Sequence, residues 1–128
     1  AACVLVTRAA GEYMDCGQGV QVCGTLTLET GLGRGVYQHV HPTVHGLWPE
    51  TGEYGSSKCI APGSRAGPTT VYSCYAVQRA SPLHQVGFEQ HEWEKHGSCA
   101  GVANESDYFT QVCELSQAPL AVMQVARD

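Results

Sequence analysis

Seven cysteines constrain this 128-residue chain more than any other feature of its sequence. They are spread along the whole chain, at Cys3, Cys16, Cys23, Cys59, Cys74, Cys99 and Cys113. No two of them form a CxxC pair of the kind that holds zinc. Widely spaced cysteines favour disulfide bonds, which persist in oxidising compartments. We therefore expect a disulfide-stapled protein that is secreted or lies in a lumenal compartment. The odd number leaves at least one cysteine free or joined to another chain.

The length matches one ordinary domain, so we expect residues 1–128 to form a single unit with its own core. No stretch approaches about 18 consecutive apolar residues, and we expect no membrane span. The chain begins AACVLVTRAA, without Met and without the pattern of a signal peptide, which indicates a processed or trimmed chain. Asn104, followed by Glu105 and Ser106, is a glycosylation sequon and agrees with secretion.

The formal net charge of −5 excludes the basic surface by which many proteins hold nucleic acid. The chain has six histidines, however, and their protonation would change the net charge from −5 to +1. Attraction to a polyanion would increase as pH falls through about 6.5, the usual histidine pKa. This favours an acidic working environment, although six histidines without any common role would give the same composition.

Extended structure is predicted mainly in the first half of the chain. Residues 24–29, GTLTLE, alternate apolar and polar side chains as a half-buried strand does. Residues 36–47 are rich in β-branched residues and are expected to be extended, with an edge or break at Pro42. Glycines and prolines make 48–70 a long irregular loop, which Cys59 could staple. Residues 69–77 fit a strand or a helix equally well.

Helices are predicted mainly in the second half. One begins near Phe88 and ends at Gly97, and a second is capped by Asn104 or Ser106. Pro119 suits the first position of a further short helix that runs through Ala126. The fold class is therefore α+β, with an antiparallel central sheet and helices packed on it.

The segment HEWEKHGSC, residues 91–99, concentrates ionisable side chains. At about 100° per residue, one helical face about 140° wide carries two imidazoles, a carboxylate and an ammonium: His91, Glu92, Lys95 and His96. Trp93 can then turn to the core and Glu94 to solvent. The alternative is a solvated polar end of a helix.

Two imidazoles beside an ammonium suit the cleavage of a phosphodiester by a neighbouring hydroxyl. One base takes the hydroxyl proton, one acid protonates the leaving oxygen, and a cation offsets the charge on the phosphoryl oxygens. Two histidines of one short helix cannot easily flank an in-line attack, so a histidine from elsewhere is needed. His45, in HGLWPE, follows a predicted strand and precedes the long loop, where a strand end can direct a side chain into a site.

HGLWPE and HEWEKHGSC resemble the two signature segments of the ribonuclease T2 family, HGLWP and HEWxKHGTC, in the same order. The resemblance implies that His45 is the general acid and His96 the general base. It also implies that His91 binds phosphate, and that Glu92 and Lys95 stabilise the pentacovalent phosphorane. The implied reaction cleaves RNA to a 2′,3′-cyclic phosphate without a metal or other cofactor. It spares DNA, which lacks the nucleophile.

The resemblance extends to binding and to disulfide pairing. It implies stacking of single-stranded RNA bases on aromatic side chains in a first site with Trp48, Glu50 and Tyr54, and in a second site with Phe88. For Trp48, packing in the core is an equal alternative. The family also pairs a cysteine at the end of the second segment with one in the loop after the first, which implies the bond Cys59–Cys99. Cys16–Cys23 and Cys74–Cys113 are further candidate pairs. We expect a monomer without membrane contact.

The chain departs from the family pattern in four places, the mildest of which is Ser98 in place of the common Thr. Glu89 stands where relatives often carry Trp, and LETG replaces a QWP strand segment near the N-terminus. The chain also stops soon after the helix that follows the second segment. These departures affect the completeness of the sheet and leave the five implied catalytic residues in place.

Two other classes compete with a ribonuclease. HEWEKH resembles the zinc motif HExxH, but its histidines are five residues apart and diverge by about 140° on a helix. His39 and His41, which share strand parity with His45, would be its further ligands; a structural or surface role is the alternative, as for His84. The second class is a non-catalytic interaction, toxin or storage protein built on the same fold.

Overall fold

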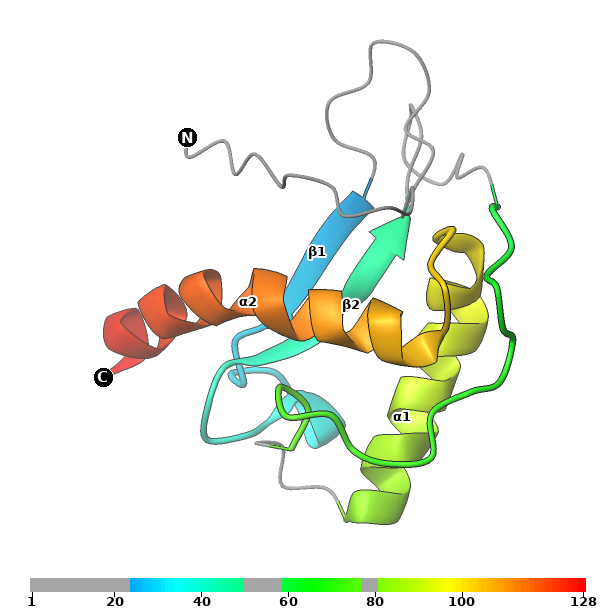
Figure 1. The fold of residues 1–128 in the computed structure, drawn as a ribbon. Helices are drawn as coiled ribbons and strands as arrows, with labels where there is room; N and C mark the ends of the chain where they lie inside the picture. Colours follow the sequence, from blue (N-terminus) through cyan, green and yellow to red (C-terminus); the bar gives the residue numbers. More distant parts are fainter. Residues whose placement is uncertain (1–23, 50–58, 77–80) are drawn as a thin grey trace, which may run out of the picture.

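The computed structural model describes residues 24–49, 59–76 and 81–128. They form two strands, two α-helices and two short 3₁₀ helices: β1 (Gly24–Glu29), η1 (Gly35–Tyr37), β2 (Thr43–Pro49), α1 (Pro82–Lys95), η2 (Gly97–Cys99) and α2 (Glu105–Arg127). Figure 1 shows their arrangement. The α+β class with an antiparallel sheet and packed helices is confirmed.

The strands β1 and β2 form an antiparallel pair. The predicted strand 24–29 coincides with β1, and Leu26 and Leu28 pack against the core as the alternation requires. The prediction of extended structure over 36–47 is wrong in its first half, because η1 lies at 35–37 and β2 begins only after Pro42. Proline lacks the N–H that a strand ladder needs, so the strand starts at the next residue.

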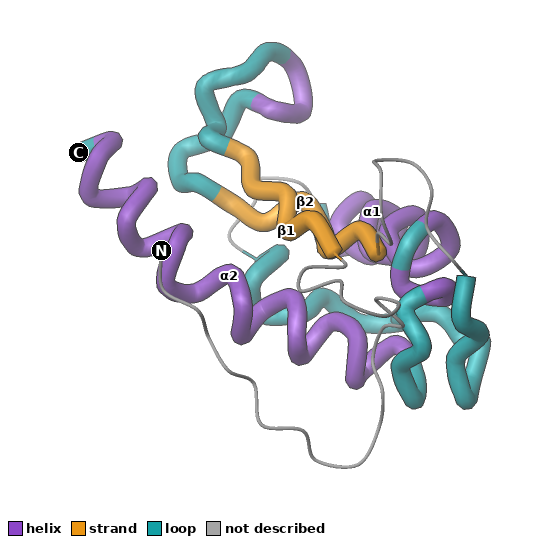
Figure 2. The backbone as a smooth tube through the Cα atoms, turned by 90° about the horizontal axis from the view of Figure 1, so that it is seen from above, coloured by secondary structure: helices purple, strands orange, loops and turns teal. Residues whose placement is uncertain are grey.

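The two helices flank the strand pair on different sides. The long helix α2 crosses one face of the pair, whereas α1 runs beside β2, as Figures 1 and 2 show together. Apolar side chains from β2, both helices and the connecting segments form one core, against which Leu26 and Leu28 of β1 pack. The buried members are Val44, Leu47, Tyr75, Trp93, Ala100, Val102, Tyr108, Phe109 and Val112. The hydroxyl of Tyr108 donates to the carbonyl of Leu47 over 2.7 Å and thereby ties α2 to β2.

The helix boundaries differ from the predicted ones. Helix α1 begins at Pro82, where the side chain of Ser81 caps it, and it ends at Lys95 rather than at Gly97. Asn104 caps α2, with its side-chain oxygen accepting from the amide of Asp107 over 2.9 Å. Pro119 does not start a separate helix; it lies inside α2. The sequence pattern missed this because an internal proline costs helix stability that packing elsewhere along the helix offsets.

An irregular segment, residues 59–76, wraps around α1 and is held by two disulfides. Cys59 is bonded to Cys99, as the resemblance implied, and Cys74 is bonded to Cys113. Residues 69–76 form neither the strand nor the helix considered above but a bend and turns. The candidate pair Cys16–Cys23 lies outside the described residues. In the described ranges, no helix is both long and apolar enough to cross a membrane.

Candidate active site

A β-bulge directs His45 to the α1 side of the strand pair. Thr27 pairs with Gly46, but the next pair is Leu28 with Val44, so His45 has no partner on β1. The extra residue resets the alternation of β2, since Val44 enters the core while His45 stays half-buried on the opposite side. Bulges re-aim side chains in this way and recur beside active sites. His45 therefore lies inside β2, not at a strand end as the sequence suggested.

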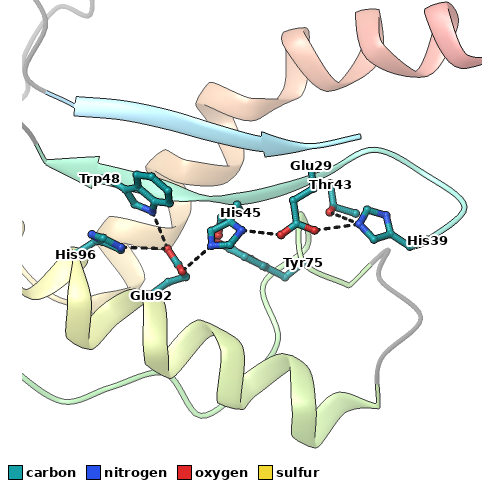
Figure 3. Close-up of polar contacts among 8 residues, drawn as sticks. All are labelled: Glu29, His39, Thr43, His45, Trp48, Tyr75, Glu92 and His96. Carbon is teal, nitrogen blue, oxygen red and sulfur yellow. Dashed lines mark hydrogen bonds and ion pairs between the residues drawn. The ribbon is translucent and has the colours of Figure 1, made fainter. Parts of the chain in front are cut away.

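The carboxylate of Glu92 lies at the centre of the site. This α1 side chain is 1% exposed and faces β2. Oε1 lies 3.2 Å from Nε2 of His45, and Oε2 accepts from the indole N–H of Trp48 over 3.2 Å. Nε2 of His96 lies 3.9 Å from Oε2, as Figure 3 shows. Gly46 leaves the space for this carboxylate, since a Cβ there would collide with Oε2.

His45 is held at both ring nitrogens by carboxylates. Nδ1 lies 2.7 Å from Oε1 of Glu29, and Nε2 faces Glu92. Because a carboxylate only accepts hydrogen bonds, both nitrogens donate, and the ring is fully satisfied as an imidazolium. The bond to Glu29 and then the bond to Glu92 outweigh burial and raise the pKa of His45 to about 9. This imidazole is poised to give up a proton.

His96 has the opposite tendency. It is the C-cap residue of α1, and its half-buried ring stacks on Trp48 with centroids 5.1 Å apart. Burial, and then the positive charges of His91, His45 and Lys95, lower its pKa below 6.5, against the attraction of Glu92. This imidazole is poised to accept a proton. Environments that separate two pKa values in this way are a signature of acid and base pairs.

The structure brings together three of the five implied catalytic residues through direct contacts: His45, Glu92 and His96. His91 and Lys95 lie on the exposed part of α1, where their charges reach His96. Trp93 is buried in the core and Glu94 is exposed, as the helical spacing predicted.

The predicted base-binding residues fall into two groups. Trp48 and Phe88 are half-buried, and each presents its ring to an imidazole of the site. Trp48 stacks on His96, and Phe88 meets His45 edge to face at 5.0 Å while also packing against the core. Glu50 and Tyr54 lie outside the described residues.

Sequence reasoning missed the residues that hold His45 on the side away from Glu92. Glu29 contacts it directly, and His39 in turn contacts Glu29 over 3.0 Å. Tyr75 donates from its hydroxyl to the backbone carbonyl of His45 over 3.0 Å. The signal that was available is the position of Glu29 at the end of a predicted strand, in the LETG segment that departs from the family pattern.

No group of three or more His, Cys, Asp or Glu side chains in the described part of the chain is arranged to hold a metal ion. His39 is buried against Glu29, and exposed His41 bonds to Gln124, so neither shares a set of ligands with the histidines of α1.

Comparison with known proteins places these residues in a family. The sequence profile of the Ribonuclease T2 family matches residues 20–125. A curated relative from Sus scrofa, named Ribonuclease T2, is 38% identical over 80 residues, which cover 57% of this chain and 40% of the relative. The chain thus spans well under two thirds of that relative's length. No solved structure matches it.

Proposed function

Because this chain belongs to the ribonuclease T2 family, we propose that it is an endoribonuclease that cleaves single-stranded RNA by transesterification, without a metal. The observation that carries the proposal is the arrangement of two imidazoles on one buried carboxylate, with opposite shifts of pKa. Hydrogen bonds to carboxylates raise the pKa of His45 to about 9, burial lowers the pKa of His96, and both rings lie within ion-pair distance of Glu92.

In the proposed reaction His96 accepts the proton of the ribose 2′-OH. The 2′ oxygen then bonds to phosphorus, the bond from phosphorus to the 5′ oxygen breaks, and His45 gives its Nε2 proton to the leaving oxygen. The product carries a 2′,3′-cyclic phosphate, which water opens with the two roles exchanged. DNA lacks the attacking hydroxyl and is not cleaved.

The remaining site residues stabilise the charge on the phosphate and bind the RNA bases. His91 binds the phosphate from the exposed side of α1, and Lys95 with Glu92 stabilises the phosphorane. Trp48 and Phe88, together with Glu50 and Tyr54, contact the bases. The stacking of Trp48 on His96 supports this role, because a base that enters can exchange with that ring contact.

The pH dependence follows from the two pKa values. kcat/KM rises with pH through the pKa of His96, which lies below 6.5, and falls as pH passes the pKa of His45 near 9. The chemical step thus tolerates acid without requiring it. The proposed preference for acidic pH comes from substrate binding, since protonation of histidines other than His45, which already carries its charge, makes the negatively charged chain less repulsive to a polyanion.

The proposed setting is a secreted or acidic lumenal compartment, and the protein acts there as a monomer. Two disulfides in the described residues support an oxidising environment. Asn104 is exposed and is the proposed glycosylation site. Its Oδ1 caps α2, which leaves the amide nitrogen for the sugar.

The test is cleavage of RNA and DNA at about pH 5 in EDTA, with identification of the product ends. We expect cyclic phosphate ends from RNA alone. His45→Ala and His96→Ala should each lower kcat/KM by about 10²–10⁴-fold, whereas His84→Ala, a histidine change at an exposed position, should not. RNA binding without cleavage would favour the non-catalytic alternative, and loss of cleavage in EDTA would favour a metal enzyme.

A further inference from the structure

We infer that Glu29 is a positioning residue for the reaction, which fixes the orientation and protonation of His45 from the side away from Glu92. The catalytic role of Glu29 rests on the proposed function, whereas its contact with His45 is independent of that function.

Glu29 reaches His45 because of the bulge. It is the last residue of β1 and pairs with Thr43, two positions before His45 on β2. With His45 turned to the α1 side, the Glu29 carboxylate meets it side-on, and Oε1 lies 2.7 Å from Nδ1. This is a shorter contact than the one between Nε2 and Glu92, which measures 3.2 Å.

The carboxylate of Glu29 is itself held in place. Its second oxygen, Oε2, lies 3.0 Å from Nε2 of His39, whose Nδ1 faces the carbonyl oxygen of His41 at 2.6 Å. His39 is only 7% exposed, so this ring cannot easily swing away. Figure 3 shows the resulting chain, in which two carboxylates alternate with three imidazoles: His39, Glu29, His45, Glu92 and His96.

The two ring nitrogens of His45 are held unequally, since Nδ1 lies 2.7 Å from Glu29 and Nε2 lies 3.2 Å from Glu92. A hydrogen bond at one ring nitrogen sets the role of the other. With Nδ1 tied to Glu29, Nε2 is the nitrogen that gives its proton to a leaving oxygen and later takes one from water. An ionised partner at Nδ1 also stabilises the imidazolium form that a general acid needs.

The charged groups around His45 come from both flanking elements. Glu29 faces it from β1, and Glu92 faces it from α1, while the nearest rings, those of Tyr37, Trp48 and Phe88, are uncharged. Burial raises the pKa of Glu29, but the hydrogen bonds from His45 and His39 outweigh it and lower the pKa, which favours the ionised carboxylate. If the charge of Glu29 is removed, Glu92 is the remaining carboxylate that contacts the imidazole of His45.

Glu29→Gln is the decisive variant, because it keeps the shape and an oxygen acceptor while it removes the charge. The ring signals of His45 should be titrated by NMR in the free protein, and kcat/KM on RNA should be followed from about pH 4 to 10. We expect the titration of His45 and the alkaline limb of the rate profile to move down together by about one pH unit or more. At about pH 8.5 the rate should fall by about threefold or more, with a much smaller loss at about pH 5.5.

Two further variants separate the effect of the Glu29 charge from the effects of charge elsewhere and of side-chain position. Glu94→Gln makes the same chemical change at an exposed position of α1 and should move neither curve. Glu29→Asp keeps the charge but withdraws it by one methylene, and should give a smaller displacement together with a pH-independent loss of kcat. It also keeps the question answerable if Glu29→Gln does not fold.

The outcomes distinguish this inference from the proposed function. A His45 titration that is the same in wild type and Glu29→Gln overturns the role of Glu29, even in an active ribonuclease. A displaced titration in a protein that does not cleave RNA supports the contact and overturns the proposed function instead. A uniform loss of rate with an unmoved alkaline limb also counts against the inference, since it indicates a purely structural role.

Discussion

Two buried glutamates, one helical turn apart on α1, differ in how many hydrogen-bond and ion-pair partners surround their carboxylates. Glu89 is 0% exposed and Glu92 is 1% exposed. Glu92 meets an indole N–H and two imidazoles. Glu89 accepts one bond, from the backbone amide of Tyr72 over 2.7 Å, and its Oε2 has no hydrogen-bond partner among the described residues.

The difference comes from what each residue faces. Glu92 points at the bulge of β2, where donors converge and Gly46 leaves room. Glu89 points at the irregular segment that carries Tyr72, and the charge of Glu105 acts on it from α2. Burial, partly offset by the bond from the Tyr72 amide, raises the pKa of Glu89 to about 7. A buried carboxylate is therefore useful where partners surround it and costly where they do not.

The largest expected effect is on catalysis, through Glu92→Gln. This change keeps the volume but removes the charge that both imidazoles face, so the proposed transition state loses its central electrostatic contact. We expect kcat/KM on RNA to fall by about 10²–10³-fold. Glu89→Gln is the matched control, with the same chemistry one turn away, and should retain activity within a few fold. Equal effects of the two variants would mean that the contacts of Glu92 have no special catalytic weight.

Gly46→Ala tests the space that makes Glu92 fit. A Cβ at this position would collide with Oε2 of Glu92, so the carboxylate must shift and its contacts with Trp48 and His45 must lengthen. We expect a loss of about tenfold or more in kcat/KM, because even a small displacement of a catalytic group such as the Glu92 carboxylate lowers the rate strongly. Gly87→Ala, where a Cβ meets nothing, is the control. Wild-type kinetics in the Gly46→Ala variant would show that Glu92 is not held as tightly as its burial suggests.

Local patterns predicted the parts of the fold that depend on local chemistry. The alternation of GTLTLE predicted β1, and the helical spacing of 91–96 predicted that Trp93 is buried and Glu94 exposed. The position of His45 before the long loop made it a candidate, whereas the bond Cys59–Cys99 came from the resemblance and does not follow from spacing.

Tertiary features were beyond the reach of those patterns. The bulge at His45 depends on how β1 and β2 pair, and a single strand's sequence does not contain its register. Glu29 looked like a polar strand residue, because its partner lies 16 positions away. Glu89 was noticed only as a departure from the family, and its burial follows from the irregular segment packed over α1, which no periodicity predicted.

The smallest expected effect is on stability, and it sharpens the contrast between the two glutamates. The folded-state pKa of Glu89, about 7, lies above the unfolded value of 4.5. Between these values the folded protein binds more protons than the unfolded one, so wild-type stability falls as pH rises through this window. Glu89→Gln cannot ionise and retains the acceptor for the amide of Tyr72. It should therefore raise stability by about 1–2 kcal/mol above pH 7, and by little near pH 4.

Thermal unfolding across about pH 4–8 measures this, since 1 kcal/mol corresponds to a few degrees in Tm for a domain of this size. Glu94→Gln, at an exposed position, should leave the profile of Tm against pH unchanged. If Glu89→Gln gains the same stability at both ends of the range, ionisation is not the cause. If it gains none, the unpaired oxygen is satisfied in solution. With the expected profile, α1 would carry one carboxylate that costs stability on ionising and, a turn later, one whose charge serves catalysis.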